Sequence, residues 1–407
     1  MTAERSPAPA GRSPAVAALG QTLLADLDRL TERLVEAILD EDPSYSARAG
    51  VTREDLARSC HANLERLLQA LGGVSDLDSD NAFDAPRETG HRRAEQGLPL
   101  ESVLHAYRLG YRTIWEGLVA QAQTGGPASV DALVTAASEV WELVDRYSAA
   151  VADAYRHTES EIARRDDRRR DALLDALLEG RGSDRSVAAD AAAVLDLPEH
   201  GRVTVVVVHS AAESSGHGAA ARDALAVRGH RSAWRTRADR EVGIVSLGRA
   251  TLADICTALQ VVPAIRAGVA PEVEGLADVD VAHRMAETAL RALPAQRSGV
   301  VDLASCLPAA LLVTAPDLAG RLVERALGGV LALETDERAV LLDTLTTWLD
   351  TGGSAGQTAA RLYCHRNTVL NRLRRLEALT GRSLERVDHL VEWSLALMAL
   401  ELGPAPT

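Results

Sequence analysis

The sequence predicts a multidomain chain of α and α/β class, with an N-terminal helical bundle, a small central α/β domain and a C-terminal all-α helix-turn-helix. Three observations predict this order. Apolar residues recur every three or four positions over residues 15–154, β-branched runs alternate with helical segments over 188–314, and helical spacing returns from Leu318. A length of 407 residues suits two or three domains, and 46% hydrophobic residues can supply a core for each.

The N-terminal region is expected to begin with a disordered tail. Residues 1–18 are rich in alanine, proline and arginine and lack an apolar secretion segment. Residues 21–39 then carry apolar side chains at helical spacing. A second helix, over residues 52–71, begins with the capping pattern Thr52-x-x-Asp55.

Two longer helices should complete the bundle. The composition of residues 72–86 predicts a loop, and Pro99 fits the first turn of the helix that follows. Another helix is expected from Val130 towards Arg156. Five of its side chains are expected to face inward: Val134, Val140, Trp141, Val144 and Tyr147.

Residues 158–182 interleave both signs of charge. Five arginines lie among three aspartates, ahead of a leucine-rich stretch that ends at Gly180. Such a run is typical of a solvated helix with local ion pairs. We interpret it as a connector helix that could pair with its copy in a dimer, and an exposed linker is an equal alternative.

The central region, residues 183–316, alternates strands and helices. The β-branched run Val203–Val208 is typical of a buried strand. Further strands are expected at 242–247, 265–269 and 300–303, and helices at 219–227, 252–259 and 279–293. The last region, residues 317–403, should be helical with breaks at Gly328-Gly329 and Gly352-Gly353.

Composition excludes several classes of protein. The chain has no lysine, so its 44 basic residues are all arginine, whereas Walker-type phosphate loops, protein kinases and Schiff-base enzymes require a lysine. No stretch reaches the ~18 apolar residues of a membrane span, so we expect a cytoplasmic protein with no membrane partner. The four cysteines and 11 histidines lack the spacing of ligand sets. We expect no metal site and no cofactor.

The last seventy residues carry the strongest functional pattern. A helix that Thr335-Asp336-Glu337 should cap places Leu341, Leu345 and Trp348 on one face. A short helix over residues 355–362, a turn at Tyr363-Cys364 and a third helix from His365 complete a helix-turn-helix. This turn often contains glycine, so the bulky Tyr363 counts against the motif.

The third helix divides its side chains between two faces. At about 100° per residue, three apolar residues share one face, and Asn367, Asn371 and Arg374 lie opposite. A recognition helix needs this division, because asparagine can pair with adenine and arginine with guanine. The apolar three are Val369, Leu373 and Leu376.

These patterns assign roles to individual side chains. Arg366, Asn367 and Asn371 are the expected base readers, and Thr368, Arg374 and Arg375 the expected phosphate contacts. Between Arg361 and Arg386, seven arginines stand against two glutamates in a chain whose net charge is −14. A solvated basic helix docking on an acidic neighbour is the alternative. The complete expected DNA-contacting set is Arg361, His365 as the helix cap, Arg366, Asn367, Thr368, Asn371, Arg372, Arg374 and Arg375.

The string Ala359-Ala360-Arg361-Leu362-Tyr363-Cys364-His365-Arg366-Asn367-Thr368-Val369, followed by Leu379-Thr380-Gly381, resembles the C-terminal helix-turn-helix of PucR-type (CdaR-like) bacterial transcriptional regulators. The central region is similar to the degenerate GGDEF-like domain that these regulators carry. Residues 93–100 and 106–110 resemble the helical sensor domain of RsbR-type proteins. The resemblance implies a sensor domain over residues 19–157, a GGDEF-like domain over 183–316 and a DNA-binding domain over 317–403.

Rival functions have weaker support. Gly216-His217-Gly218 partly matches a dinucleotide fingerprint, but the loop before it is long and serine-rich. A nucleotidyl cyclase needs a Gly-Gly-Asp/Glu-Glu-Phe turn and metal-binding carboxylates, whereas residues 239–243 read Asp-Arg-Glu-Val-Gly. Tyr107, Tyr111 and Trp115 could line a sensor pocket, although aromatic residues at helical spacing are more often core.

We therefore expect a non-enzymatic, sequence-specific DNA-binding transcriptional regulator. Its expected partners are double-stranded DNA, a second copy of the chain in a homodimer or higher oligomer, and a small-molecule effector. The alternative is a partner-switching scaffold in stress signalling, which would need no basic recognition face.

Overall fold

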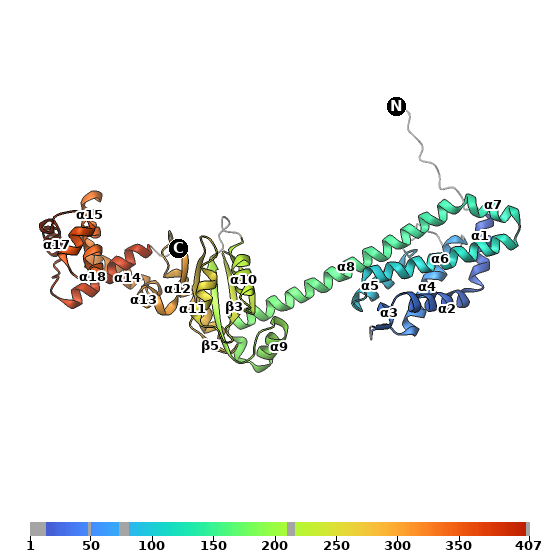
Figure 1. Ribbon diagram of the computed structural model, residues 1–407, viewed down its shortest axis with the longest axis horizontal. Helices are drawn as coiled ribbons and strands as arrows, with labels where there is room; N and C mark the ends of the chain where they lie inside the picture. Colours follow the sequence, from blue (N-terminus) through green and yellow to red (C-terminus); the bar gives the residue numbers. More distant parts are fainter. Residues whose placement is uncertain (1–13, 48–49, 73–80, 210–215, 404–407) are drawn as a thin grey trace, which may run out of the picture. The chain divides into compact units, whose positions relative to one another are not determined.

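The computed structural model describes residues 14–47, 50–72, 81–209 and 216–403. They belong to two compact units, residues 1–167 and 168–407 (Figure 1). One helix contributes to both units, because α8 runs from Ala137 to Leu178.

The first unit is a helical bundle with a leucine-rich core. Thr52 caps α4 as expected, since its side chain accepts a hydrogen bond from the backbone N–H of Asp55. Pro99 stands at the N-cap of α6 rather than in its first turn. The helices are α1 (Pro14–Leu24), α2 (Leu27–Glu41), α3 (Ser44–Ala47), α4 (Arg53–Leu71), α5 (Asp84–Glu95), α6 (Leu100–Thr124), α7 (Pro127–Thr135) and α8.

Three expectations for the start of this unit need correction. The tail predicted over residues 1–18 is wrong from Pro14 onward, where α1 begins, and residues 1–13 lie outside the described part. The single helix predicted over 21–39 is two helices, because the chain breaks at Ala25-Asp26. Helix α5 was not predicted, since its polar sequence carries little apolar periodicity.

The predicted helix from Val130 is also divided. It breaks at Ala136 between α7 and α8, and the break changes which side chains face the core. Val140, Val144 and Tyr147 are buried as predicted, whereas Val134 is 69% exposed and Trp141 is 51% exposed. The Trp141 ring instead lies against the Trp115 ring, with centroids 6.0 Å apart.

The expected connector is the continuation of α8, with no helix boundary near residue 157. Residues 163–170, which carry its arginines and two of its aspartates, are exposed. The last turns differ, because Leu174, Leu177 and Leu178 are buried in the core of the α/β domain. Pairing of this helix with a second copy stays a prediction.

The second unit contains a mixed sheet with strand order β2-β3-β1-β4-β6, in which β5 also pairs with β1. Strand β1 is antiparallel to β3, β4 and β5, and only β4 and β6 are parallel among the described pairs. The strands are β1 (Arg202–His209), β2 (Ser232–Arg237), β3 (Arg240–Ser246), β4 (Arg266–Val269), β5 (Val273–Glu274) and β6 (Gly299–Asp302).

Helices cover both faces of this sheet, which explains the unbroken valine run in β1. Val203, Val205 and Val207 pack against α9, α12 and the end of α8. Val206 and Val208 pack in a second cluster with residues of α10 and α11. The helices are α9 (Arg185–Leu195), α10 (His217–Val227), α11 (Leu252–Leu259) and α12 (Val279–Arg291).

The four predicted strands and three predicted helices of this domain are present, whereas two strands and helix α9 were missed. Strand β2 reads Ser-Ala-Trp-Arg-Thr-Arg, which lacks an apolar run. Its Arg235 and Arg237 both bind the Asp175 carboxylate of α8, at 3.0 and 2.7 Å. The loop expected after Val208 falls largely on residues 210–215, outside the described part.

The C-terminal helices follow the α/β domain. They are α13 (Leu307–Thr314), α14 (Pro316–Leu331), α15 (Thr335–Asp350), α16 (Ala355–Arg361), α17 (Arg366–Thr380) and α18 (Val387–Leu402). Thr335 does not cap α15, because Glu334 holds the N-cap position without a side-chain hydrogen bond. The predicted break at Gly352-Gly353 is present, since both residues have positive φ angles of 62° and 82°.

The break predicted at Gly328-Gly329 is wrong, because α14 runs through both glycines. Gly329 serves close packing instead. A Cβ atom there would lie 2.2 Å from the carbonyl oxygen of Leu379 in α17, whereas a Cβ on Gly328 would meet only Glu324 Cγ at 4.0 Å. The glycine therefore lets α14 and α17 approach closely.

No single helix in the described ranges is long and apolar enough to cross a membrane. One pair, residues 303–314 with α14, passes by length and composition but is bent by 89°.

We predict that Gly329→Ala destabilises the C-terminal helices by about 1–3 kcal/mol, because the new methyl group forces α14 away from Leu379. Gly328→Ala is the matched control. It should be neutral or stabilise by up to about 1 kcal/mol, since alanine favours a helix and the site has room. Chemical denaturation of both variants measures the difference, and equal stabilities would contradict the close approach.

Candidate nucleic-acid interface

Helices α16 and α17 form a helix-turn-helix. Ser354 caps α16 by accepting a hydrogen bond from Gln357 N at 3.4 Å, and the Thr351 and Thr358 hydroxyls meet at 2.8 Å. Tyr363 lies in the turn with a φ of 50° and a side chain that is 97% exposed. The turn thus adopts the left-handed conformation that glycine usually supplies, and the bulky side chain projects into solvent.

Helix α17 has the predicted buried face. Val369, Leu373 and Leu376 are at most 2% exposed and pack with residues of α14, α15 and α16. The same core contains Trp393 of α18, which is fully buried and donates its Nε1–H to the Ala326 carbonyl at 3.2 Å. Burying three large side chains on one side fixes the rotation of α17 about its axis.

The N-terminus of α17 is closed by His365. Its Nδ1 accepts a hydrogen bond from the backbone N–H of Asn367 at 3.2 Å, so His365 holds the N-cap position. The predicted cap is therefore present in the structure.

The opposite face of α17 is exposed and polar. Asn367, Asn371 and Arg374 all lie in solvent, and Arg374 Nη1 is 3.4 Å from Asn371 Oδ1. Arg366 in the first turn and Arg361 at the end of α16 are also exposed. Among the described residues, no ion pair occupies Arg361, Arg366 or Arg374.

Two side chains on the flank of α17 that were expected to contact DNA bind residues of α15. Arg372 is half-buried and donates to the Thr344 hydroxyl at 3.3 Å, and Arg375 lies 3.5 Å from the Glu337 carboxylate. Thr368 is half-buried beside them in a shallow groove between α15 and α17. Arg372 and Arg375 are thus less free than their sequence positions indicate.

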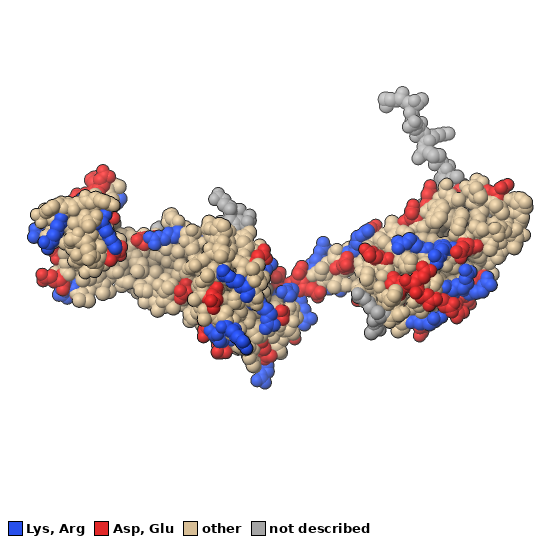
Figure 2. Space-filling model, viewed as in Figure 1, with Lys and Arg blue, Asp and Glu red and all other residues tan. Residues whose placement is uncertain are grey.

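The local charge excess is smaller than the sequence count. Arg382 is buried, and its Nε and Nη2 bind Glu392 Oε2 at 2.9 and 2.5 Å. Its Nη1 binds the Arg325 carbonyl at 2.6 Å, and Arg386 pairs with Asp388. On the face that Figure 2 shows, the C-terminal helices at the left carry both basic and acidic side chains.

Two partners of the expected site were missed from sequence. Glu337 and Thr344 lie in α15, 38 residues before Arg375 and 28 residues before Arg372, respectively. Only a helical wheel of α15 placed beside that of α17 could have found them. In the described residues, no group of His, Cys, Asp and Glu side chains has the arrangement of a metal site.

Three parts of the chain match known protein families. Residues 28–170 match the N-terminal domain of the RsbT co-antagonist protein rsbRD, residues 179–292 match a GGDEF-like domain, and residues 341–399 match the PucR C-terminal helix-turn-helix domain. These matches confirm the fold class and the family resemblance expected from sequence. The exact domain limits stay predictions.

Two individual proteins are similar to parts of the chain. Over 67 residues the chain is 43% identical to the purine catabolism regulatory protein of Bacillus subtilis (strain 168), a segment that covers 16% of this chain and 13% of that protein. The crystal structure of a regulator of polyketide synthase expression from Bifidobacterium adolescentis is 21% identical, with a TM-score of 0.31, and covers 57% of this chain and 96% of that chain. The chain thus spans only a small part of the length of the Bacillus subtilis relative.

We predict that the stability of the C-terminal helices falls in acid because of Glu392. Its hydrogen bond from Arg382 holds the pKa of this carboxyl below its usual value. The stabilisation is complete above the unfolded pKa of about 4.3 and is lost as the pH falls through the lower folded pKa. Glu392→Gln should cost about 1–3 kcal/mol at pH 7 and weaken the acid dependence.

Thermal unfolding between neutral pH and pH 3 measures both effects. Asp388→Asn is the control, because the pair of Asp388 with Arg386 is exposed and solvent screens it. A larger loss for Asp388→Asn than for Glu392→Gln would contradict this role of Arg382.

Proposed function

We propose that this chain, which combines RsbRD-type, GGDEF-like and PucR-type helix-turn-helix domains, is a sequence-specific DNA-binding transcriptional regulator. One observation carries the proposal. Helix α17 buries Val369, Leu373 and Leu376 and exposes asparagine and arginine side chains on the other side. A helix held down in this way can enter the major groove with its polar face towards the bases.

Base reading is proposed for the first two turns of α17. Asn367 and Asn371 lie four residues apart on one face, and each amide can donate to and accept from an adenine edge. Arg366 can form the bidentate contact that guanine offers. The Arg374 guanidinium beside Asn371 can orient that amide and reach a neighbouring phosphate.

Phosphate contacts are proposed for the flank that faces α15. Arg372 and Arg375 start from bonds to Thr344 and Glu337, and Thr368 lies with them in the groove. Because the Arg375–Glu337 pair is exposed and 3.5 Å long, exchanging it for a phosphate costs little. Arg361 at the end of α16 is the proposed contact on the other helix of the motif.

The protein is proposed to act in the cytoplasm as a dimer or higher oligomer. One helix reads only a few base pairs, so two heads on paired half-sites raise affinity and specificity. A small-molecule signal at the first unit or the GGDEF-like domain would change the spacing of the heads through α8. Equal DNA affinity with and without every candidate effector would contradict this coupling.

The test is binding of the purified full-length protein to the DNA upstream of its own gene and to scrambled DNA, across a salt series. We expect tight, sequence-dependent binding that Asn367→Ala abolishes. Weak binding without sequence preference, lost at moderate salt, would contradict the proposal. The match of residues 28–170 would then favour a stress-signalling scaffold.

We predict different effects for Asn371→Ala and Arg375→Ala. Asn371→Ala should cost about 1–3 kcal/mol of binding energy at one base position and relax the preference there. Arg375→Ala should weaken binding to all sequences and lower the salt slope by about one. Binding titrations on a set of single-base operator variants separate the two.

Glu337→Gln is the control for Arg375. It removes the competing carboxylate and should tighten binding to every sequence, because Arg375 then meets phosphate without losing an ion pair. Unchanged or weaker binding by Glu337→Gln would contradict a phosphate contact by Arg375.

A further inference from the structure

The first unit contains a partly open cavity of about 50 Å³ between α2, α3, α4, α5, α6 and α8. One water needs about 10–15 Å³ of such space, so the volume suits an occupant of about three to five non-hydrogen atoms. Tyr107 and Tyr111 line it, whereas Trp115 does not. The sensor pocket considered in the sequence analysis therefore corresponds to a cavity that Tyr107 and Tyr111 line.

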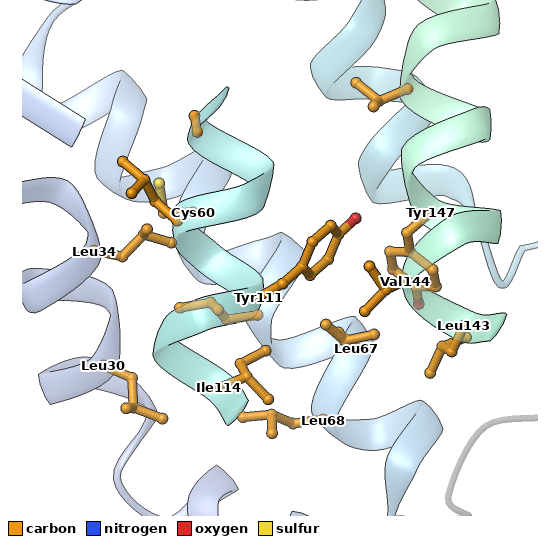
Figure 3. Packing of buried hydrophobic residues seen from close by; sticks show 14 of the residues in the cluster. Leu30, Leu34, Cys60, Leu67, Leu68, Tyr111, Ile114, Leu143, Val144 and Tyr147 are labelled. Atoms are coloured by element: carbon orange, nitrogen blue, oxygen red, sulfur yellow. The ribbon is translucent and has the colours of Figure 1, made fainter. Parts of the chain in front are cut away.

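Most of the cavity wall is apolar. Leu34, Leu67 and Ile114 contribute aliphatic side chains, and Tyr111 extends between the helices that carry Leu67 and Val144 (Figure 3). The Cys60 thiol also faces this space, and burial raises its pKa to about 12, so it stays neutral. An occupant must therefore be largely apolar.

Polar side chains gather at one end of the cavity, where Arg93, Ser59 and Tyr45 meet. Arg93 is 1% exposed, and its Nη2 donates to Ser59 Oγ at 3.1 Å. Its Cζ lies 6.0 Å from the centre of the Tyr45 ring. These groups could hold one polar atom of an occupant.

The Tyr45 hydroxyl has no hydrogen-bond partner among the described residues, although the side chain is only 3% exposed. Other lining hydroxyls are satisfied: Tyr107 donates to Asn63 Oδ1, and Thr89 donates to the Ala85 carbonyl, both at 2.8 Å. Among the described residues, His283 Nε2 is the buried side-chain nitrogen or oxygen without a partner, so the Tyr45 oxygen is reached by open space rather than sealed in the core. The free O–H is suited to an occupant with a hydrogen-bond acceptor.

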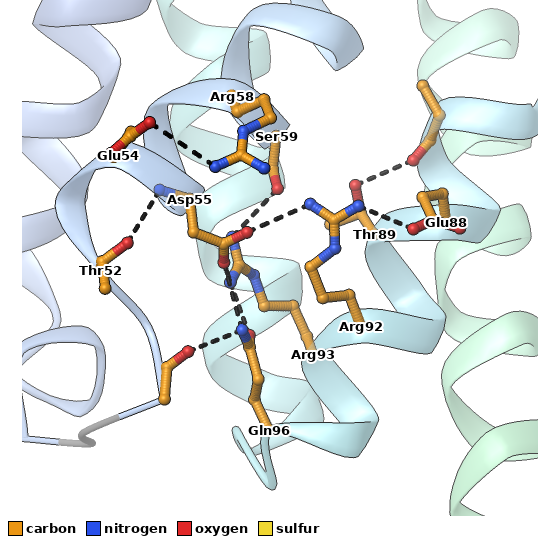
Figure 4. Close-up of polar contacts among 12 residues, drawn as sticks. Thr52, Glu54, Asp55, Arg58, Ser59, Glu88, Thr89, Arg92, Arg93 and Gln96 are labelled. Atoms are coloured by element: carbon orange, nitrogen blue, oxygen red, sulfur yellow. Dashed lines mark hydrogen bonds and ion pairs between the residues drawn. The ribbon is translucent and has the colours of Figure 1, made fainter.

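The charges around the polar end already balance. Asp55 accepts from Arg93 at 2.6 Å and from Arg92 at 3.2 Å, and Glu88 accepts from Arg92 at 2.7 Å (Figure 4). Two arginines thus face two carboxylates. An anionic occupant would find no uncompensated positive charge, so a neutral one is favoured.

We infer that this cavity is a binding site for a small, uncharged and mainly apolar molecule whose carbonyl or hydroxyl oxygen accepts a hydrogen bond from Tyr45. Binding itself does not depend on DNA recognition. Its role as the regulatory signal rests on the function proposed above.

Three probes of equal size test the ligand class: 2-butanone, its hydrocarbon counterpart 2-methyl-1-butene, and propionate. Each has five non-hydrogen atoms. The ketone has a carbonyl acceptor and no charge, the alkene has no acceptor, and propionate has acceptors and a negative charge. Saturation-transfer NMR on the full-length protein without DNA should show 2-butanone binding more tightly than the other two. Propionate or the alkene binding as tightly as the ketone, or no binding of the ketone at millimolar concentration, would overturn the inference.

Tyr45→Phe tests the hydroxyl directly. It should lower the affinity for 2-butanone by about threefold to tenfold and leave the melting temperature nearly unchanged, because no hydrogen bond within the fold is lost. Tyr155→Phe is the matched control, since that hydroxyl donates to the Leu98 carbonyl at 2.6 Å and Tyr155 does not line the cavity. It should lower stability and leave the affinity unchanged.

Ala106→Val fills part of the same space and provides a second test. It should weaken ketone binding while the fold, followed by circular dichroism, is retained. Unchanged ketone affinity in both Tyr45→Phe and Ala106→Val would overturn the site. DNA binding is measured separately on each variant. If ketone binding changes as predicted while DNA binding fails, the proposed regulatory function is contradicted and the ligand site is not.

Discussion

Helix α17 can present polar side chains only because its other side is buried. Val369, Leu373 and Leu376 pack with residues of α14, α15 and α16, and Gly329 lets α14 come within contact distance of α17. This packing fixes the helix rotation, so the direction of Asn367 and Asn371 follows from the core rather than from the loops. The proposed sequence preference depends on that rotation. If α17 were rotated by one residue, the Asn367 and Asn371 amides would face the DNA backbone instead of base edges.

Local patterns in the sequence were sufficient to predict those elements whose contacts lie close by in the chain. The division of α17 into two faces, its His365 cap and strand β1 all follow from periodicity and residue type. Contacts across the fold could not be predicted in this way. Arg382 counted as surface charge in the sequence, yet Glu392 and the Arg325 carbonyl bury it. Gly329 looked like a helix end because only the position of Leu379 reveals its purpose.

The absence of lysine gives arginine two distinct uses in this chain. At Arg93 and Arg382 the guanidinium binds several oxygens at once and organises buried structure, which its planar fork permits. At Arg361, Arg366 and Arg374 the same group is exposed without an ion pair among the described residues. The proposed regulator would bind its small ligand beside the first kind of arginine and DNA with the second.

Methylation interference at guanine N7 tests the orientation of α17 most directly, because N7 lies in the major groove. The DNA should be a site that the purified protein selects from a random pool. We predict strong interference at one or two guanines in each half-site, lost specifically in Arg366→Ala at the guanine that Arg366 contacts. Binding that tolerates methylation at every major-groove position would contradict base reading by this helix.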